Sequence, residues 1–288
     1  LKIAPKRISD QLDEREPIEL DHLARYKVGD KVLSLLIDNF SVEEIQHLLG
    51  ASGQVPAGTP GTCLVGKLAE NINPLAAEIK AIQAENPLGD LPVDQSLGTW
   101  RLQGRIGNIY PDAMLRYGYT KFRHDRLLQV WIEHLALCSV AGAHPKKSQY
   151  ICRKSAGPEL KKVHFHEVGN PETILKDLLD LYTLGQSEPL LFFPKSSSAY
   201  WEIISKAEDE SEETSTKALD AARSKWIEKD YGANECLDFR QLFRDADPGP
   251  LDEDYHDMVQ LQGEENRFGP LTEKIFGPLY EHTGEKSG

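Results

Sequence analysis

The chemistry that residues 99–137 suggest is metal-dependent hydrolysis of a phosphodiester. In TWRLQGRIGNIYPDAMLRYGYTKFRHDRLLQVWIEHLAL, apolar and polar residues alternate over 99–106 and 113–120, which predicts two paired strands, and an amphipathic helix follows. Such hydrolysis needs two or three carboxylates that converge on magnesium, usually with a lysine beside them. Asp112 is the one acid in the strand pair, and it falls at the turn. The residues therefore predict a nuclease-like layout whose active site is lost.

Basic residues dominate this segment instead of acids. Residues 100–167 contain 12 Lys/Arg and 5 Asp/Glu, although the whole chain has a formal net charge of −13. Arginine and lysine bind phosphate without hydrolysing it. The predicted DNA-binding candidates are Arg105, Arg116, Lys121, Arg123 and Arg126. The same excess of charge also fits an ordinary solvated surface, and the residues alone leave both interpretations open.

Three further motifs carry weaker signals. GTCLVGKL, residues 61–68, matches the G-x-x-x-x-G-K-[ST] phosphate-binding loop except at Leu68, which replaces the hydroxyl residue. No clear strand precedes it. His164 and His166 share one face of a predicted strand but have no third metal ligand nearby. Glu133 and His134 are adjacent on a helix, about 100° apart, so they do not converge as an acid–base pair. The sequence therefore predicts no metal, no cofactor and no catalytic residue in this chain.

The elements that position these residues follow from periodicity and capping. Ser41, with Glu44 three residues later, predicts a capping box, and Ser196–Ser198 are predicted to cap a later helix. The expected helices are 31–40, 41–50, 63–86, 123–141, 171–182, 218–229 and a group around Leu271, Ile275 and Leu279. The other expected strands are 149–155 and 161–168, joined as a hairpin, with an extended lead-in at 1–27 and loops at 51–62 and 87–98.

The most regular helix, 123–141, carries its apolar residues on one face. They are Leu127, Leu128, Trp131, Leu135 and Cys138. Together with the strands, this helix predicts one α/β (α+β) domain with a small mixed sheet flanked by many helices.

Cysteine usage and hydropathy indicate a cytoplasmic protein. Cys63, Cys138, Cys152 and Cys236 are far apart and form no C-x-x-C pair, which is typical of buried free thiols in a reducing compartment. No apolar run approaches the roughly 18 residues that a membrane-spanning helix needs. The chain begins with leucine and has nothing like a signal peptide, so we expect a fragment of a longer protein.

Four segments resemble the carboxyl-terminal domain of the RecC family. They are LQGRIGNIYPDAMLRYGYTKFRHDRLLQVWIEHLAL, DLLDLYTLGQSEPLLFFPKSSSAYW, EREPIELDHLARYKV and GQVPAGTPG, and the resemblance covers nearly the whole chain. RecC proteins are the gamma subunits of exodeoxyribonuclease V, the bacterial RecBCD helicase–nuclease. The resemblance implies a PD-(D/E)XK, restriction-endonuclease-like fold, similar to the nuclease domain of the partner subunit RecB but without its active site.

The nuclease motif can be placed on this sequence residue by residue. Active relatives carry G-x-x-D on one strand and D-Y-K on the next. The corresponding lost positions here are Gly107 and Arg116 for the two acids and Gly118 for the lysine. A slip of one residue does not restore both acids, because Asp112 is the only acid available. The resemblance also implies one nuclease-like domain in three parts: a helical lead-in with an insertion at 1–97, a sheet core with its helix at 98–167, and a helical part at 168–288.

The resemblance implies a structural role in DNA repair and recombination. We expect contact with RecB-like and RecD-like subunits and with forked or single-stranded DNA, while the ATPase, helicase and nuclease activities belong to the rest of the complex. Two alternatives from other classes stay open. One is an active magnesium-dependent nuclease with acids from elsewhere, such as Asp125, Glu133 or Glu167, and the other is a protein–protein module without DNA affinity.

Overall fold

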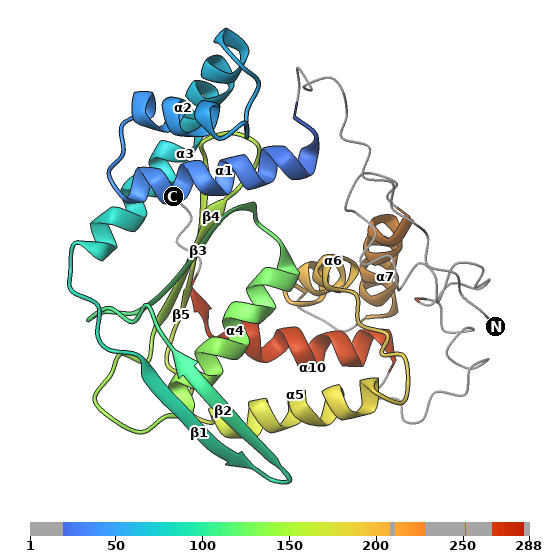
Figure 1. Ribbon diagram of the computed structural model, residues 1–288. Coiled ribbons are helices and arrows are strands. Elements are labelled where there is room, and N and C mark those ends of the chain that lie inside the picture. Colours follow the sequence, from blue (N-terminus) through green and yellow to red (C-terminus); the bar gives the residue numbers. More distant parts are fainter. Residues whose placement is uncertain (1–19, 208–210, 228–250, 252–266, 285–288) are drawn as a thin grey trace, which may run out of the picture. The chain divides into compact units, whose positions relative to one another are not determined.

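The chain contains both helices and short strands, in runs of one to several elements of each kind, which confirms the mixed α/β class (Figure 1). The computed structural model describes residues 20–207, 211–227, 251 and 267–284. The helices are α1 (His22–Ile37), α2 (Val42–Ala51), α3 (Thr59–Gln83), α4 (His124–Ser139), α5 (Pro171–Gly185), α6 (Pro194–Ile204), α7 (Glu212–Ile227) and α10 (Phe268–Glu281). The strands are β1 (Leu91–Leu97), β2 (Trp100–Ile106), β3 (Met114–Lys121), β4 (Ser148–Arg153), β5 (Leu160–Phe165) and β6 (Thr283–Gly284).

The chain divides into two units. The first unit holds the residues up to Ile82 together with Gly118–Thr120 and Arg153–Leu160, and the second unit holds the remainder. The predicted division into a lead-in, a sheet core and a helical carboxyl-terminal part stays a prediction.

Helix α1 of the first unit begins nine residues earlier than the sequence suggested. The Asp21 carboxylate caps it by accepting a hydrogen bond from the backbone N–H of Ala24 at 2.7 Å. The sequence pattern obscured this start because Gly29 interrupts the helix-forming residues. The predicted capping box of α2 is confirmed, since the side chains of Ser41 and Glu44 each accept a hydrogen bond from the other residue's backbone N–H.

The ring of Tyr119 fixes α1 within the first unit. A Cβ atom at Gly29 would lie 2.1 Å from Tyr119 Cε1, so only glycine lets the helix approach this ring so closely. The guanidinium of Arg153 lies over the ring of Tyr119, 3.9 Å from the ring centroid. The Nε of Arg153 also donates a hydrogen bond to the Tyr119 carbonyl oxygen at 2.7 Å. The backbone of Gly29, the ring of Tyr119 and the guanidinium of Arg153 therefore pack against one another.

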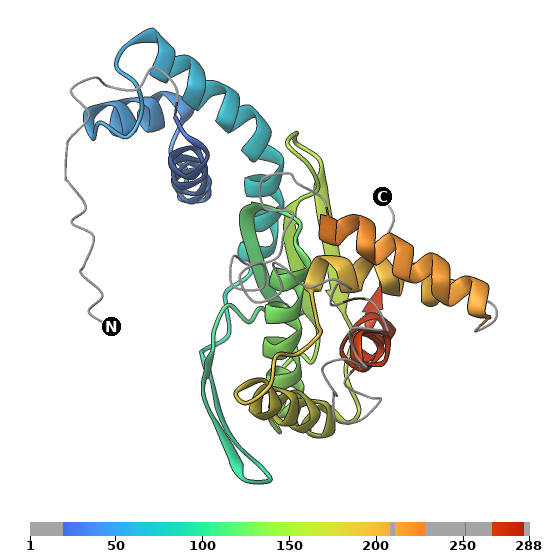
Figure 2. The same cartoon turned by 90° about the vertical axis from the view of Figure 1, so that its right-hand side faces the viewer.

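In the second unit β1 and β2 form a two-stranded antiparallel ribbon, which corrects the predicted strand pairing. The register pairs Leu91 with Ile106 and Leu97 with Trp100, and Gly98 turns the chain with φ +65°. The predicted partner of β2 was β3, and 87–98 was expected to be a loop. Pro92 suggested that loop, yet among the described strands β1 pairs with β2 alone, and such an edge strand tolerates proline. Figure 2 shows the turn of the ribbon projecting beyond α5.

The second sheet has the strand order β3-β4-β5-β6. The predicted strands 149–155 and 161–168 are confirmed as β4 and β5, with slightly different ends. In the loop between them, Lys154 N–H donates to the Glu159 carbonyl oxygen at 2.8 Å, as expected for a hairpin. Phe165 of β5 pairs with Thr283 of β6, so the end of the described chain closes this sheet.

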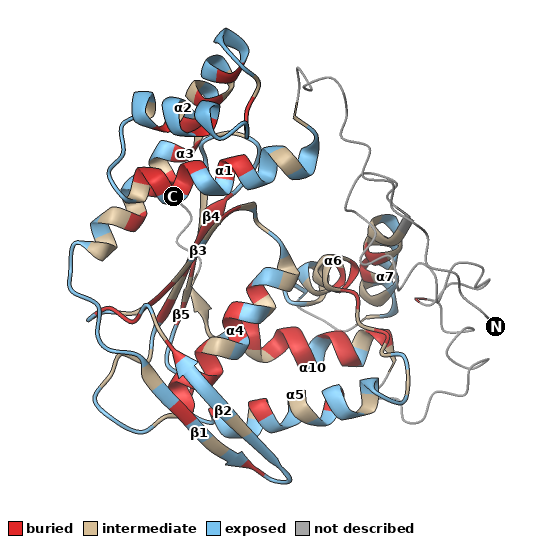
Figure 3. Ribbon diagram, viewed as in Figure 1, coloured by how far each residue is buried: buried red, intermediate tan, exposed pale blue. Residues whose placement is uncertain are grey.

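Helix α4 supplies the centre of the core, as its periodicity predicted. The four residues Leu127, Trp131, Leu135 and Cys138 are buried, and Leu128 is half-buried against them. Residues of β4, β5, α5 and α10 complete this core (Figure 3). Burial of this apolar surface is the main stabilising contribution to the second unit.

Two further expectations about helix boundaries are wrong. Ser196–Ser198 lie inside α6, which begins at Pro194, and Ser197 Oγ accepts a hydrogen bond from Phe193 N–H. Proline at the first helical position was the stronger start signal. Helix α7 begins at Glu212, six residues before the predicted start at 218. The structure describes this helix as far as Ile227, so the predicted end at 229 lies outside the described residues.

The structure shows where the segment GTCLVGKL and three of the four cysteines lie. Residues 61–68 lie inside α3, so they form no loop that could cradle a phosphate. The three described cysteines are free thiols, but Cys63 is exposed while Cys138 and Cys152 are buried. Cys236 lies outside the described residues.

No helix in the described ranges combines the length and the apolar character that crossing a membrane requires.

Candidate functional site

The guanidinium of Arg116 lies where β3, α4 and the segment after β2 meet. Its Nε donates to the Glu133 carboxylate, and its Nη1 donates to the carbonyl oxygens of Gly107 and Leu115, each at 2.9 Å. The side chain of Arg116 is 21% exposed and that of Glu133 is 45% exposed. Charge-assisted hydrogen bonds to three oxygens hold the cation in a defined position.

Asp90 is an acid near Gly107 that was not predicted from the sequence. A Cβ atom at Gly107 would lie 2.9 Å from Asp90 Oδ1, so the carboxylate of Asp90 lies where a side chain at position 107 would begin. Asp90 directly precedes β1, in the segment that was expected to be a loop. The alternation of Leu91, Val93 and Leu97 is the signal that could have revealed this strand.

The structure brings together two of the three positions matched to the nuclease motif. Gly107 and Arg116 are joined by a hydrogen bond, and Gly118 lies two residues further along β3, on the same face as Arg116. Asp112 is exposed in the bend before β3, as predicted. The residues at this site do not fit a divalent cation, because the guanidinium of Arg116 already binds the carboxylate of Glu133.

The remaining DNA-binding candidates differ from Arg116 in that all four are exposed. Arg123 makes two hydrogen bonds to Asp125, at 2.9 and 2.8 Å, and Arg126 donates to Gln129. The side chains of Arg105 and Lys121 have neither a hydrogen bond nor an ion pair within the described part of the chain. Arg105 and Lys121 are therefore the best placed for a phosphate, and the assignment of all five residues stays a prediction.

The acids proposed for an active nuclease do not converge. Asp125 pairs with Arg123 at 2.8 Å, Glu167 lies 3.7 Å from Lys146, and Glu133 is held by Arg116. Among the described residues no group of three or more His, Cys, Asp or Glu side chains is arranged to hold a metal ion, the pair His164 and His166 included.

His134 is a core residue and not a catalytic base. It is fully buried, its Nδ1 lies 2.7 Å from Ser148 Oγ, and its Nε2 lies 2.9 Å from the His166 carbonyl oxygen. Because a carbonyl only accepts, Nε2 carries the proton and Ser148 donates to Nδ1. Burial lowers the pKa of His134 to about 4. The burial of Cys138, one turn away, raises the pKa of its thiol.

The residue His124 is half-buried, but both of its ring nitrogens are shielded from solvent. Its ring packs edge-on against Phe122 and Phe276, with centroid distances of 5.0 and 6.3 Å. Neither ring nitrogen has a hydrogen-bond partner among the residues that the structure places. Burial lowers the pKa of His124 to about 4, so the ring is neutral at physiological pH.

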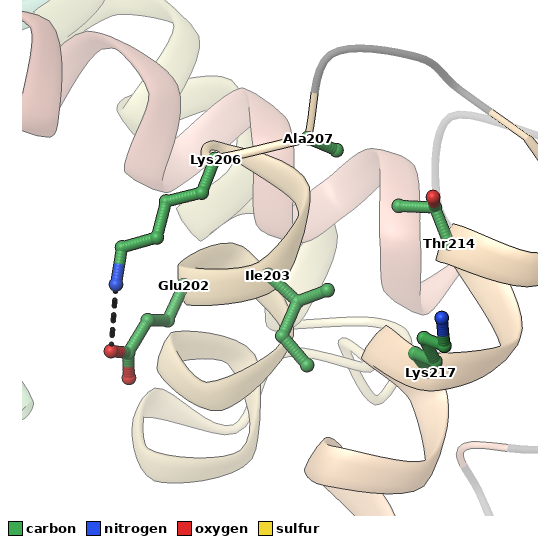
Figure 4. A pocket seen from close by; sticks show the side chains of 6 residues that line it. All are labelled: Glu202, Ile203, Lys206, Ala207, Thr214 and Lys217. Atoms are coloured by element: carbon green, nitrogen blue, oxygen red, sulfur yellow. Dashed lines mark hydrogen bonds and ion pairs between the residues drawn. The ribbon is translucent and has the colours of Figure 1, made fainter.

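A shallow depression between α6 and α7 carries no catalytic grouping (Figure 4). Lys206 pairs with Glu202 at 3.0 Å, and Lys217 pairs with Glu213 at 2.7 Å. The residues that line it are Glu202, Ile203, Lys206, Ala207, Thr214 and Lys217. With its charges paired in this way, the depression has no group placed to act as an acid, base or nucleophile.

Fold and site together define a mixed α/β domain in which an arginine organises the junction of a strand and a helix. Comparison with known proteins places this domain more narrowly. The profile of the RecC C-terminal domain family matches residues 1–205, and the chain belongs to this family.

Full-length relatives agree with the family assignment. A RecBCD enzyme subunit RecC from Escherichia coli (strain K12) is 23% identical over 250 residues, which cover 84% of this chain and 22% of that protein. The RecC subunit from Mycolicibacterium smegmatis is 26% identical over 266 residues, 91% of this chain and 24% of that protein. The chain thus spans less than a quarter of the length of these relatives.

Proposed function

We propose that this chain is a non-catalytic, nuclease-like domain of a RecC-type subunit, with a PD-(D/E)XK-like core that has lost its active site. It scaffolds the subunits of a RecBCD-type helicase–nuclease, exodeoxyribonuclease V, and guides DNA strands in double-strand break repair and recombination. The family assignment supports the complex, since the matched relatives are named as RecBCD subunits. In this proposal the ATP-dependent, helicase and nuclease activities belong to other parts of the complex.

The observation that carries the non-catalytic part of this proposal is the position of Arg116. Hydrolysis of a phosphodiester by a metal ion requires carboxylates that are free to bind the cation and activate water. Here Glu133 is neutralised by Arg116, and position 107 has no side chain. An arginine binds a phosphate but supplies neither a Lewis acid nor a general base at neutral pH.

The partners follow from the same assignment. RecB-like and RecD-like subunits are the protein partners, forked or single-stranded DNA is the nucleic-acid partner, and the bacterial cytoplasm is the compartment. Exposed helices in the carboxyl-terminal half favour protein contact, because residues 168–288 carry 26 Asp/Glu and 12 Lys/Arg and suit a basic protein surface better than DNA.

The DNA-guiding role predicts binding without cutting. We expect the purified chain to bind forked and single-stranded DNA at low salt, with magnesium present and the DNA intact. Replacing Arg105 and Lys121 together by alanine should reduce the slope of log K against log salt by about 1.4 on single strands, since each lost phosphate contact removes about 0.7. Fluorescence anisotropy across a salt series measures this slope, and gel electrophoresis monitors the DNA.

A matched control removes two positive charges elsewhere. Lys206→Ala with Lys217→Ala lowers the net positive charge equally, but both lysines are already paired with carboxylates on α6 and α7. The control should keep the wild-type slope. Magnesium-dependent cutting that Glu133→Gln abolishes would favour the active nuclease, and no retention of DNA at low salt would leave the protein–protein module as the function.

A further inference from the structure

The outer edge of β2 is an unpaired strand edge. Among the described strands β2 pairs with β1 alone, and the register closes the ribbon by pairing Leu97 with Trp100 across a two-residue turn. These two residues exchange backbone hydrogen bonds, and such pairs alternate along an antiparallel ladder. The backbone N–H and C=O groups of Arg101, Gln103 and Arg105 therefore point away from β1, and they have no hydrogen-bond partner within the described structure.

The two edges of the ribbon differ in their capacity to take a further strand. Pro92 lies opposite Arg105, so the outward row of donors on β1 lacks one N–H. Strand β1 also lies against α4, where Gln95 Nε2 donates to the Ser139 carbonyl oxygen at 3.0 Å. Strand β2 contains no proline and is exposed over most of its length (Figure 3). An added strand would therefore pair with β2.

The exposed face of the ribbon beside this edge carries two arginines. Arg101 is paired with Asp94 of β1 at 2.7 Å, whereas the side chain of Arg105 has no such partner within the described residues. A second copy that paired along the whole of β2, centred on Gln103, would place Arg101 opposite Arg105. Like charges in such positions repel and acidic residues there attract, so the charges favour a different, acidic chain over a second copy.

The opposite face beside the same edge is apolar and has a gap. Trp100 is 37% exposed and Leu102 is half-buried, and the same face is buried at Ile106. Between Leu102 and Ile106, a Cβ atom at Gly104 would meet nothing within 4 Å. A large apolar side chain on a neighbouring strand packs well over an edge glycine, so this face suits an apolar residue opposite Gly104.

We propose that the outer edge of β2 is a docking site for an extended segment of a partner protein in which acidic and apolar residues alternate. The segment adds a third strand to the ribbon. Its acidic residues lie beside Arg101, Gln103 and Arg105, and its apolar residues lie on the face of Trp100 and Gly104. Backbone hydrogen bonds supply the affinity and the two faces supply the specificity. This inference goes beyond the proposed function and does not depend on DNA binding.

The test measures amide hydrogen exchange by nuclear magnetic resonance, with the purified chain and the synthetic peptide acetyl-EVEFEVE-amide. In the free chain the amides of Arg101, Gln103 and Arg105 should exchange quickly, and those of Leu102 and Gly104 slowly because they face β1. Saturating peptide should slow the first three amides by about tenfold or more. The basic peptide KVKFKVK and the rearranged peptide EEVFVEE, which has the same composition without the alternation, should protect none of them.

Gln103→Pro and Ser96→Pro are a matched pair of variants. Each removes one outward N–H from the ribbon, on β2 and on β1 respectively, and neither changes a charge. Gln103→Pro should weaken binding of the acidic peptide by about tenfold or more, and Ser96→Pro by about twofold at most. Because Gln103→Pro leaves Arg105 in place, it should not change the salt dependence of DNA binding.

Arg105→Glu tests the charges and serves if a proline variant does not fold. It should weaken binding of the acidic peptide about fivefold, because an attractive cross-strand pair becomes a repulsive one. The proposal is overturned if the acidic peptide protects none of the three amides, which would identify the arginines as charges that keep other strands away from this edge. It is also overturned if Ser96→Pro weakens binding as much as Gln103→Pro, or if Arg105→Glu leaves the affinity unchanged.

Discussion

Replacing Gly29 by alanine is expected to lower the free energy of unfolding of the first unit by about 2–3 kcal/mol. The added Cβ would lie 2.1 Å from Tyr119 Cε1 and 2.3 Å from Cζ, far inside van der Waals contact. The ring cannot move away freely, because the guanidinium of Arg153 lies 3.9 Å from its centroid. Urea denaturation followed by circular dichroism measures the change.

The direction of this effect is opposite to that of helix propensity, which makes the prediction specific. In an open helix interior, alanine is about 1 kcal/mol more favourable than glycine. Gly50 of α2 is the matched control, because a Cβ there would meet nothing within 4 Å, so Gly50→Ala should be neutral or stabilising. A Gly29→Ala variant as stable as Gly50→Ala would show that the contact with Tyr119 is not tight.

A double-mutant cycle isolates the contact itself. Tyr119→Ala removes the ring that obstructs the new Cβ, so the cost of Gly29→Ala should fall to near zero in that background. A cost that stays unchanged would place the strain elsewhere in α1.

Acidification is the second change with a large expected effect on stability. Burial lowers the pKa values of His124 and His134 to about 4 in the folded protein, against about 6.5 in the unfolded chain. Above pH 6.5 both states are neutral at these residues, and neither histidine contributes to the pH dependence. Between pH 6.5 and about 4 the unfolded chain binds protons that the folded chain does not, so stability falls with the pH, by up to about 3 kcal/mol for each histidine.

The same substitution at each histidine separates the two contributions. His124→Phe should leave stability at pH 7 unchanged or higher, because the ring lies among phenylalanines and loses no hydrogen bond within the described structure. This variant should also remove about half of the stability loss that the two histidines cause on acidification. Denaturant midpoints measured from pH 7 to pH 4.5 give the stability at pH 7 and its decrease on acidification.

His134→Phe should behave differently. It leaves the buried Ser148 hydroxyl and the His166 carbonyl oxygen without their partner, so we expect a loss of about 2–4 kcal/mol already at pH 7. Equal stability of the two phenylalanine variants at pH 7 would contradict the roles assigned to these histidines.

Local patterns were enough for much of the secondary structure. The capping box of Ser41 and Glu44 and the apolar face of α4 were both predictable. The hairpin of β4 and β5 was also predictable from its alternation and its loop. These features depend on residues close together in the chain, where helix and strand periods decide which side is buried.

The sequence by itself determined the mixed α/β class and the shortage of acids between 99 and 121. Only the tertiary structure decided that β2 pairs with β1, that Asp90 approaches Gly107 and that Arg116 binds Glu133. The physical reason is that a period of two identifies the buried face of a strand but not its partner. Likewise, the meeting of residues 116 and 133 depends on how a strand and a helix pack together, which no local spacing specifies.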